Sequence, residues 1–248
     1  MTDKVVVITG GSRGIGRATA LAAARRGFRV VVGYATNKAA ADEVVAQISA
    51  SNGKAIAVKC DVASEADILA LFKAADAFGT LGALVNNAGI VGKTSRLEDI
   101  SAERITHMMA VNVSGSLLCA REAVRRLSTK RGGQGGVIVN LSSAAARLGG
   151  ANSYIDYAAS KGAIDSFTLG LGYEVAAEGI RVAAIRPGLI DTEIHASGGE
   201  PDRAQRLAGN VPMKRVGTAD EVANAIVWLM SDEASYVTSA ILDVSGGR

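Results

Sequence analysis

The sequence has few of the residues that build disulfide frameworks, metal centres or base-stacking surfaces. Its 248 residues include two cysteines, two histidines and three prolines, and aromatic residues make up 4%. Cys60 and Cys119 lie in apolar stretches without metal-ligand spacing, which predicts core packing in a reducing compartment. With so few rings, the chain offers little for stacking on nucleic-acid bases.

Charge of one sign and long apolar runs are also lacking. The 27 basic and 24 acidic residues leave a net charge of +3, which gives no reason to expect a polyanionic partner. The first apolar run, Val5–Thr9, is shorter than the roughly 7–15 residues of a secretory signal core. No run approaches the roughly 18 residues of a membrane span. We therefore expect a cytoplasmic protein that binds neither nucleic acid nor membrane.

One dense basic group interrupts this balance, near the end of an amphipathic stretch with helical period. Cations at the C-terminal end of a helix complement its dipole. We therefore expect a solvated helix end, with nucleic-acid binding as a remote alternative. The group consists of Arg121, Arg125, Arg126, Lys130 and Arg131.

What is present is the pattern of a compact α/β protein: 48% hydrophobic and 21% charged residues, enough for one domain over residues 1–248. Short β-branched runs alternate with amphipathic stretches, which predicts a doubly wound fold whose parallel sheet carries helices on both faces. The runs are Val5–Thr9, Arg29–Gly33, Ala55–Lys59, Ala83–Asn86, Val137–Leu141, Arg181–Arg186 and Ala240–Asp243.

Residues 191–215 break the alternation with a polar, irregular stretch that contains Pro201 and Pro212. The stretch follows the run that ends at Arg186, and open α/β sheets bind ligands beyond the carboxyl ends of their strands. It is therefore predicted to be a substrate lid. A disordered surface loop is an equally open alternative.

A glycine-rich turn follows the first predicted strand and precedes a helix. Glycine permits the sharp turn and lets backbone N–H groups approach a pyrophosphate at a helix N-terminus. The residues after Gly16 are Arg17 and Ala18, not the Lys and Ser or Thr of a nucleoside-triphosphate loop. A dinucleotide is therefore the expected ligand, held by Gly10, Ser12, Arg13, Gly14, Ile15 and Gly16.

The second predicted strand leads into Tyr34, Asn37 and Lys38, which we expect on the adenosine side of the cofactor. The carboxylate that usually binds the ribose 2′-hydroxyl is missing, because none occurs before Asp42. A carboxylate would repel a 2′-phosphate, and Arg13 and Lys38 would attract one. The sequence therefore favours NADP(H), with NAD(H) also possible.

A serine, a tyrosine and a lysine form the candidate catalytic set. Tyr157 and Lys161 are four residues apart, so they share one face of a helix. A neighbouring ammonium, together with the positive nicotinamide ring when oxidised, would favour the phenolate and lower the pKa of the tyrosine, as general acid–base catalysis requires. Ser143 follows the fifth predicted strand, although Ser142 competes for the same role.

The sequence resembles the short-chain dehydrogenase/reductase family along nearly its whole length, closest to 3-oxoacyl-carrier-protein reductases and glucose dehydrogenase-like enzymes. The resemblance implies a Rossmann-type seven-stranded sheet, hydride transfer involving nicotinamide, and a homotetramer. The matching segments are Thr9–Gly16, Asp61–Val62, Asn86–Gly89, Asn112, Ser143, Tyr157–Lys161 and Pro187–Gly188.

The resemblance also implies a role for each matched residue. Tyr157 would be the general acid/base, Ser143 would bind the substrate oxygen, and Lys161 would bind the nicotinamide ribose. Asn112 would hold a relay water, or else only cap a helix kink. The remaining cofactor contacts would be Asp61, Val62, Asn87, Ala88, Gly89, Pro187, Gly188, Ile190 and Thr192.

We therefore predict an NADP(H)-dependent oxidoreductase that acts on a small or medium carbonyl or alcohol. A non-enzymatic NADP-binding scaffold or redox sensor is the second hypothesis, which the intact Ser143, Tyr157 and Lys161 set disfavours. A sugar-nucleotide epimerase or dehydratase, the third, usually needs a longer substrate domain. The sequence does not identify the substrate.

Overall fold

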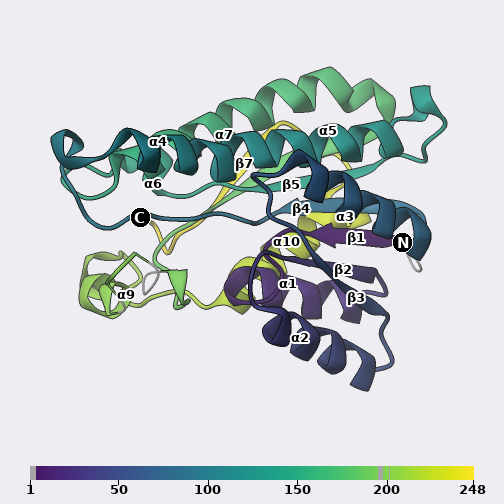
Figure 1. Ribbon diagram of the computed structural model, residues 1–248, viewed down its shortest axis with the longest axis horizontal. Coiled ribbons are helices and arrows are strands. Elements are labelled where there is room, and N and C mark those ends of the chain that lie inside the picture. Colours follow the sequence, from purple (N-terminus) through teal and green to yellow (C-terminus); the bar gives the residue numbers. More distant parts are fainter. Residues whose placement is uncertain (1–3, 195–197, 201) are drawn as a thin grey trace.

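Seven parallel strands form one sheet in the order β3-β2-β1-β4-β5-β6-β7 (Figure 1). The structure is a computed structural model that describes residues 4–194, 198–200 and 202–248. Each of the seven β-branched runs forms a strand, so the predicted fold is confirmed. The strands are β1 (Val5–Ile8), β2 (Arg29–Tyr34), β3 (Ala55–Lys59), β4 (Leu81–Asn86), β5 (Gly136–Leu141), β6 (Ile180–Pro187) and β7 (Ala240–Val244).

Both faces of the sheet are buried, which explains the nearly uniform apolar character of the runs. Alternate side chains of a strand point to opposite faces. In β1, Val5 and Val7 belong to one hydrophobic core, and Val6 and Ile8 belong to the other. All four residues are 0% exposed, so neither face of β1 contacts solvent.

Helices cover the sheet in two layers, visible above and below it in Figure 1. The lower layer comprises α1 (Gly14–Arg25), α2 (Lys38–Ala50) and α10 (Ala219–Met230). The upper layer comprises α3 (Glu65–Phe78), α5 (Gly115–Leu127) and α7 (Ile155–Val175), with α4 (Ala102–Met109) beside α7. Shorter elements are α6 (Ala145–Leu148), α9 (Arg203–Leu207), η1 (Leu97–Asp99), η2 (Ala110–Ser114), η3 (Thr129–Arg131), η4 (Ala176–Glu178), η5 (Ala208–Asn210) and η6 (Asp232–Ala234). None of the described helices is long and apolar enough to cross a membrane.

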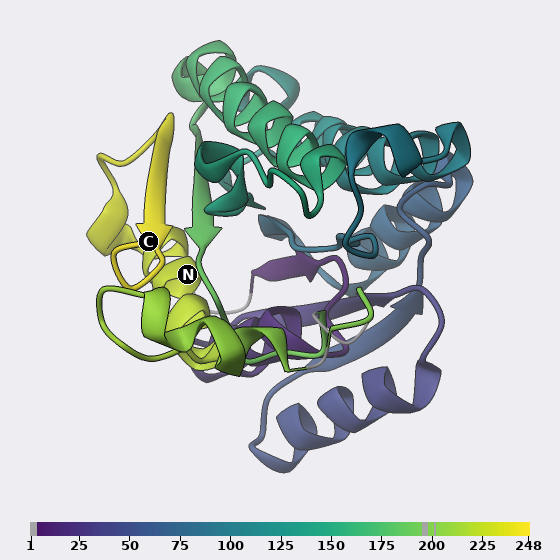
Figure 2. The same cartoon turned by 90° about the vertical axis from the view of Figure 1, so that its left-hand side faces the viewer.

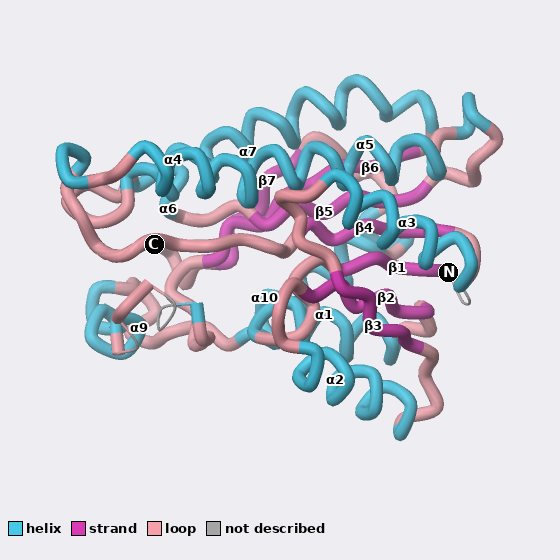
Figure 3. Tube along the Cα trace, in the orientation of Figure 1, coloured by secondary structure: helices cyan, strands magenta, loops and turns pink. Residues whose placement is uncertain are grey.

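The strand order places a crevice beyond the carboxyl ends of the central strands. From β1 the sheet grows toward β3 on one side and toward β7 on the other, so the chain changes direction between β1 and β4. Such a switch point is where open α/β sheets bind ligands. The tube in Figure 3 shows loops, drawn in pink, gathered at this end of the magenta strands.

Candidate active site

A single cleft of about 1720 Å³ collects most of the predicted site residues at the carboxyl ends of the strands. Residues that follow β1, β4, β5 and β6 all contribute to it, as the fold requires. The predicted residues that line the cleft are Gly10, Ser12, Arg13, Gly14, Ile15, Asn37, Asp61, Val62, Asn87, Ala88, Gly89, Ser143, Tyr157, Lys161, Pro187, Gly188, Ile190 and Thr192. Gly16, Tyr34, Lys38 and Asn112 are absent from the lining.

The glycine turn needs its glycines for two physical reasons. Gly10 and Gly14 have φ values of 61° and 51°, in the left-handed region where side chains are strained. Gly16 is needed for close packing, because a Cβ there would lie 2.2 Å from the Gly10 carbonyl oxygen. Gly16 therefore allows the start of α1 to pack closely against the turn and does not itself line the cleft.

The turn delivers an open helix N-terminus to the cleft. No side chain caps α1, whereas Asn37 caps α2 and Ser64 caps α3. The first N–H groups of a helix lack partners within the helix and favour an anion. The start of α1 therefore fits a dinucleotide pyrophosphate.

Asn87 fastens the loop after β4 to this turn. Its Nδ2 donates to the carbonyl oxygens of Thr9 and Gly10, each at 2.9 Å. Thr9 Oγ1 in turn accepts from the backbone N–H groups of Asn87 and Ala88 at 3.1 and 3.0 Å. Asn87 thus holds the shape of the phosphate turn as well as lining the cleft.

At the adenosine end, the structure changes the predicted set of cations. Lys38 is largely exposed, and its Nζ pairs with Asp42 at 2.6 Å, one helical turn away. Tyr34 is 8% exposed and packs in the hydrophobic core. Arg13 lines the cleft as expected, and so does Arg17, which was not among the expected cofactor contacts. The missed signal was a second arginine so soon after the glycine turn: Arg13 is the N-cap residue of α1 and Arg17 lies in its first turn, so both are beside the phosphate turn.

The carboxylates that line this end of the cleft come from outside the segment after β2. They are Asp61, which follows β3, and Glu43 on α2. Asp61 Oδ1 accepts from the Ala63 N–H at 3.0 Å, which fixes the turn after β3. The segment 33–38 itself contributes Ala35, Thr36 and Asn37 to the lining, with no acid among them.

At the other end, the loop after β5 and the first turns of α7 bring Ser143, Tyr157 and Lys161 together. Lys161 is 5% exposed, and its Nζ donates to the Leu141 carbonyl oxygen at 2.7 Å. The same Nζ lies 5.6 Å from the centre of the Tyr157 ring. Ser143 Oγ accepts from the Ala145 N–H at 3.1 Å, which holds the serine in place beside the cleft.

Ser142, the competing serine, has a different environment. It is 3% exposed, and its Oγ donates to the Lys161 carbonyl oxygen at 3.2 Å. Its hydroxyl thus braces the backbone of α7 against β5. The hydroxyl that acts on Tyr157 is that of Ser143 instead, and it works against the rise in the tyrosine pKa. The geometry therefore favours Ser143 as the serine beside the reacting groups.

The pKa shifts in the protein chain oppose the simple expectation of an acidic tyrosine. Burial raises the pKa of Tyr157 to about 12, although the nearby Ser143 hydroxyl acts in the other direction. Burial also lowers the pKa of Lys161 to about 8, with Asp165 acting in the other direction. Low-dielectric surroundings disfavour both charged forms. The site thus holds a neutral phenol beside an amine that loses its proton at a lower pH than an ordinary lysine does.

Asn112 lies within η2, a π-helical turn between α4 and α5, and is 0% exposed. Its Oδ1 accepts from the Ile90 N–H at 2.8 Å, and its Nδ2 donates to the Ile90 carbonyl oxygen and to Ser160 Oγ at 3.0 and 3.1 Å. Ser160 Oγ donates to the Tyr157 carbonyl oxygen at 2.7 Å. Asn112 therefore connects the loop after β4 with the helix that carries Tyr157.

The segment predicted as a lid lies beside this end of the cleft. Figure 2 looks at that side of the molecule, with α9 in light green. From residues 191–215, the cleft lining includes Asp191–Ile194, Gly198, Glu200 and Arg203. Residues 195–197 and 201 lie outside the described residues.

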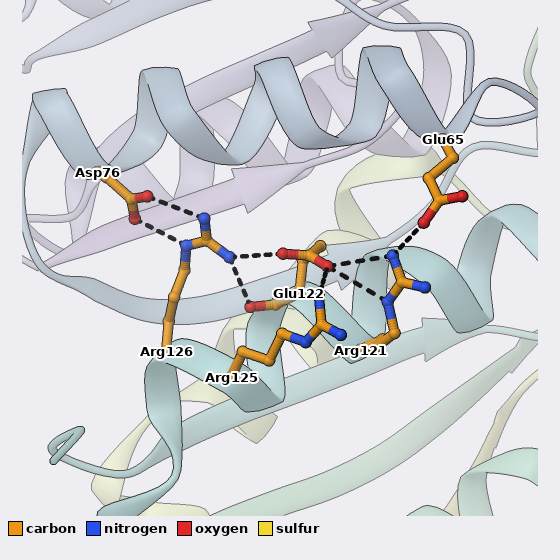
Figure 4. Close-up of polar contacts among 6 residues, drawn as sticks. All are labelled: Glu65, Asp76, Arg121, Glu122, Arg125 and Arg126. Atoms are coloured by element: carbon orange, nitrogen blue, oxygen red, sulfur yellow. Dashed lines mark hydrogen bonds and ion pairs between the residues drawn. The ribbon is translucent and has the colours of Figure 1, made fainter. Parts of the chain in front are cut away.

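The dense basic group is part of an ion-pair cluster between α3 and α5 (Figure 4). Glu122 is 3% exposed and pairs with Arg121, Arg125 and Arg126 at 3.2, 2.8 and 3.0 Å. Arg126 also binds Asp76 at 2.8 Å. Arg125 and Arg126 lie in the last turn of α5 and keep part of their surface exposed, as a solvated helix end predicts, but the prediction missed the buried carboxylate that attracts all three arginines. Their pairing lowers the positive potential that nucleic acid would need.

A seven-stranded Rossmann-type sheet, an open glycine turn and a Ser–Tyr–Lys set are together typical of dinucleotide-dependent oxidoreductases. A family model described as enoyl-(acyl carrier protein) reductase matches residues 10–248. The chain belongs to the short-chain dehydrogenase/reductase family.

The curated relatives cover almost the whole chain. The uncharacterized oxidoreductase YgfF of Escherichia coli is 54% identical over 98% of this chain and 99% of its own. Glucose 1-dehydrogenase 2 of Bacillus subtilis is 38% identical over 100% of this chain and 95% of its own. A 3-oxoacyl-[acyl-carrier-protein] reductase of Synechocystis is 38% identical over 100% and 97%. Both branches that the sequence resembles are thus represented, at equal identity.

Solved structures agree with the fold. A dehydrogenase/reductase from Sinorhizobium meliloti superposes with a TM-score of 0.92 at 31% identity, over 100% of this chain and 95% of that one. A short-chain dehydrogenase from Burkholderia cenocepacia, solved in complex with NADP, gives a TM-score of 0.90 at 32% identity over 99% and 98%.

Proposed function

We propose that this protein is an NADP(H)-dependent oxidoreductase that interconverts a small or medium carbonyl compound and its alcohol. One observation carries the proposal: a single cleft joins the uncapped start of α1 to the Ser143, Tyr157 and Lys161 side chains. The bound nicotinamide would supply or accept a hydride. The chain's own residues bind the cofactor, orient the carbonyl and move the proton.

Tyr157 is the proposed general acid for reduction and the general base for oxidation. With its pKa raised to about 12, the phenol is protonated at neutral pH and can donate a proton, whereas acting as a base requires that the charge of a bound oxidised nicotinamide lower this pKa. Ser143 is the proposed partner for the carbonyl oxygen. Lys161 has one donor on the Leu141 carbonyl oxygen and two further N–H groups for the cofactor ribose.

Asn112 is the proposed holder of a relay water behind Lys161. Its Oδ1 accepts one backbone N–H and retains a second lone pair. Gly89 leaves the space open, because a Cβ there would lie 3.4 Å from Asn112 Oδ1 and 3.5 Å from Lys161 Nζ. A water in this space would pass protons between Lys161 and solvent.

The proposed preference for NADP(H) rests on Arg13 and Arg17. Both arginines line the end of the cleft to which segment 33–38 also contributes, and that segment contains no carboxylate. A guanidinium binds a phosphate with two parallel hydrogen bonds, which a ribose hydroxyl does not match. The NADP complex of the Burkholderia cenocepacia relative is in keeping with this preference.

The proposal includes a homotetramer in a reducing, cytoplasmic compartment. Cys60 and Cys119 are buried free thiols. Apolar side chains remain exposed on α7 and near the β7 edge of the sheet, where subunits of the family commonly meet. They include Ile155, Leu169, Tyr173, Trp228, Tyr236 and Leu242.

Replacing Tyr157 by Phe tests the catalytic assignment. Tyr157→Phe removes the proton donor and leaves the ring, so NADPH affinity is expected to stay within about threefold. Turnover is expected to fall by about 10²–10⁴-fold, the usual contribution of a general acid. NADPH oxidation with a panel of ketones, β-ketoacyl thioesters, sugars and quinones measures turnover, and fluorescence titration measures affinity.

The same experiment separates the enzyme from a non-enzymatic scaffold or redox sensor. A scaffold would bind NADPH and turn over nothing in the panel, with or without Tyr157. A thiol-based sensor has little support from the structure, because burial raises the pKa of Cys60 to about 12 and also raises that of Cys119. Undiminished turnover in Tyr157→Phe would refute the catalytic role.

A further inference from the structure

A group of polar side chains lines the substrate end of the cleft, between the lid and the start of α7. Arg203, on α9, donates through Nη2 to Ser153 Oγ at 3.1 Å and to the Tyr154 hydroxyl at 3.0 Å. Its guanidinium also lies 4.8 Å from the centre of the Tyr154 ring. The Tyr154 ring meets the Tyr157 ring edge to face at 5.6 Å. Arg203 therefore stands one aromatic ring away from the proposed acid.

Glu200 neutralises this arginine. Its carboxylate pairs with Arg203 at 2.8 Å, with Arg206, and with the hydroxyl of Thr94 across the cleft. These partners, Thr94 first, lower the pKa of Glu200, so it stays ionised at neutral pH. An anionic substrate would meet a guanidinium whose charge is already balanced. Long-range attraction for a carboxylate or phosphate is therefore weak here.

The group has hydrogen-bond donors left over. Among the described residues, the buried Nε of Arg203 has no hydrogen-bond partner. The hydroxyls of Ser153 and Tyr154 accept from Arg203, and each has a proton of its own to donate. An unmatched buried donor costs about 1–3 kcal/mol. A ligand with several neutral oxygen acceptors would satisfy these donors, whereas an alkyl chain would leave them unmatched.

We propose that Arg203, Ser153 and Tyr154 form a subsite that selects neutral, hydroxyl-bearing carbonyl or alcohol substrates over alkyl or anionic ones. This inference rests on the proposed function and narrows its substrate class. A hydroxyl both accepts and donates, so it fits a lining that offers donors from Arg203 and acceptors from Glu200. Arg203 is the specificity-determining residue of the subsite.

Matched three-carbon aldehydes test this selection. Glyceraldehyde and propanal share a skeleton and differ in two hydroxyl groups, and succinic semialdehyde supplies an anionic comparison. With NADPH, kcat/KM corrected for aldehyde hydration is expected to be at least tenfold higher for glyceraldehyde than for propanal or succinic semialdehyde. In Arg203→Met, the ratio of glyceraldehyde to propanal is expected to fall to about one.

Arg206→Met is the matched control, because Arg206 also pairs with Glu200 but does not line the cleft. Arg206→Met should keep the glyceraldehyde-to-propanal ratio of the unaltered protein. A ratio that survives in Arg203→Met, however far both rates fall, would show that Arg203 supports only the lid and would overturn the subsite. The subsite would also be overturned if the glyceraldehyde-to-propanal ratio fell equally in Arg206→Met. A preference of the unaltered protein for propanal or succinic semialdehyde would overturn it as well. If other carbonyls of the panel are reduced but none of these aldehydes is, the subsite alone is overturned. If nothing in the panel is reduced either, the proposed function itself fails.

Discussion

At the scale of single residues, the buried position of Lys161 beside Tyr157 is expected to lower the stability of the folded protein. The residue is 5% exposed, and the pKa of its amine is lowered to about 8, from an ordinary value of 10.5. The folded state therefore disfavours the ammonium that the unfolded chain carries. Below pH 8 the amine is charged in both states, and the penalty for burying it is fully present.

We accordingly expect Lys161→Met to be more stable than the unaltered protein at pH 7, by about 1–3 kcal/mol, although inactive. The gain should shrink as pH rises from 8 toward 10.5, because the folded protein then holds the neutral amine while the unfolded chain still binds the proton. Urea unfolding at fixed protein concentration measures both effects.

Lys130→Met is the control for this comparison. Lys130 is an exposed lysine paired with Glu178, so its replacement should change stability by less than about 1 kcal/mol at either pH. A less stable Lys161→Met at pH 7 would contradict the proposed cost of burying the ammonium.

The proposed cofactor preference also depends on single residues. Arg13→Ala or Arg17→Ala is expected to weaken NADPH binding about tenfold or more, since a charge-assisted hydrogen bond is worth about 1.5–3 kcal/mol. NADH, which has no 2′-phosphate, should lose less than threefold. Fluorescence titration of each variant with both cofactors gives the four affinities.

Lys38→Ala supplies the contrast, because Lys38 pairs with Asp42 and does not line the cleft. It should leave both affinities unchanged. Loss of NADPH affinity in Lys38→Ala equal to that in Arg17→Ala would restore the assignment expected from sequence.

At the scale of elements, a partly buried ion pair joins α4, which leads into the turn that holds Asn112, to α7, which carries Tyr157. Arg104 on α4 donates to both carboxylate oxygens of Asp156 at 2.8 and 3.0 Å, and to the Lys93 carbonyl oxygen at 2.7 Å. The Asp156 side chain is 2% exposed and directly precedes Tyr157. Gly92 makes room for the guanidinium, because a Cβ there would lie 2.4 Å from Arg104 Cζ.

Arg104→Ala would leave the Asp156 carboxylate buried without its cation, which typically costs about 3–5 kcal/mol. We expect a loss of this size in urea unfolding. We also expect kcat to fall more than NADPH affinity, since the first turn of α7 positions Tyr157 while α1 binds the phosphates. Arg96→Ala, which breaks an exposed pair with Glu98, should cost less than about 1 kcal/mol. Equal effects of the two variants would show that the α4–α7 pair has no special role.

At the scale of the whole molecule, the edge of the sheet bears on assembly. β7 is an edge strand, and Leu242 within it is 39% exposed. Tyr236, just before the strand, is fully exposed, and Trp228 on α10 is 36% exposed. Large apolar side chains gathered at an edge are typical of an interface between subunits.

Light scattering is therefore expected to give about four times the 25.3 kDa chain mass. Leu242→Lys combined with Tyr236→Asp should produce a smaller species, because charges at a buried interface lose their hydration. Leu97→Lys, on η1, places the same charge at another exposed leucine and should leave the mass unchanged. A monomeric unaltered protein would rule out the tetramer.

The sequence by itself determined the elements and much of the cleft, because those depend on short-range rules. Apolar runs with helical stretches between them define a parallel sheet, and glycines at fixed spacing define a phosphate turn. The spacing of Tyr157 and Lys161 puts both on one helical face. Each of these signals lies within a few neighbouring residues.

Only the tertiary structure decided which of two similar residues faces the cleft and what surrounds it. It gave Ser142 and Ser143 different hydrogen-bond partners, placed Arg17 but not Lys38 in the cleft lining, and gathered three arginines around the buried Glu122. It also raised the pKa of Tyr157 instead of lowering it. The physical reason is common to all of these: burial and charge pairing depend on elements far apart in the chain, and local sequence carries no record of which ones meet.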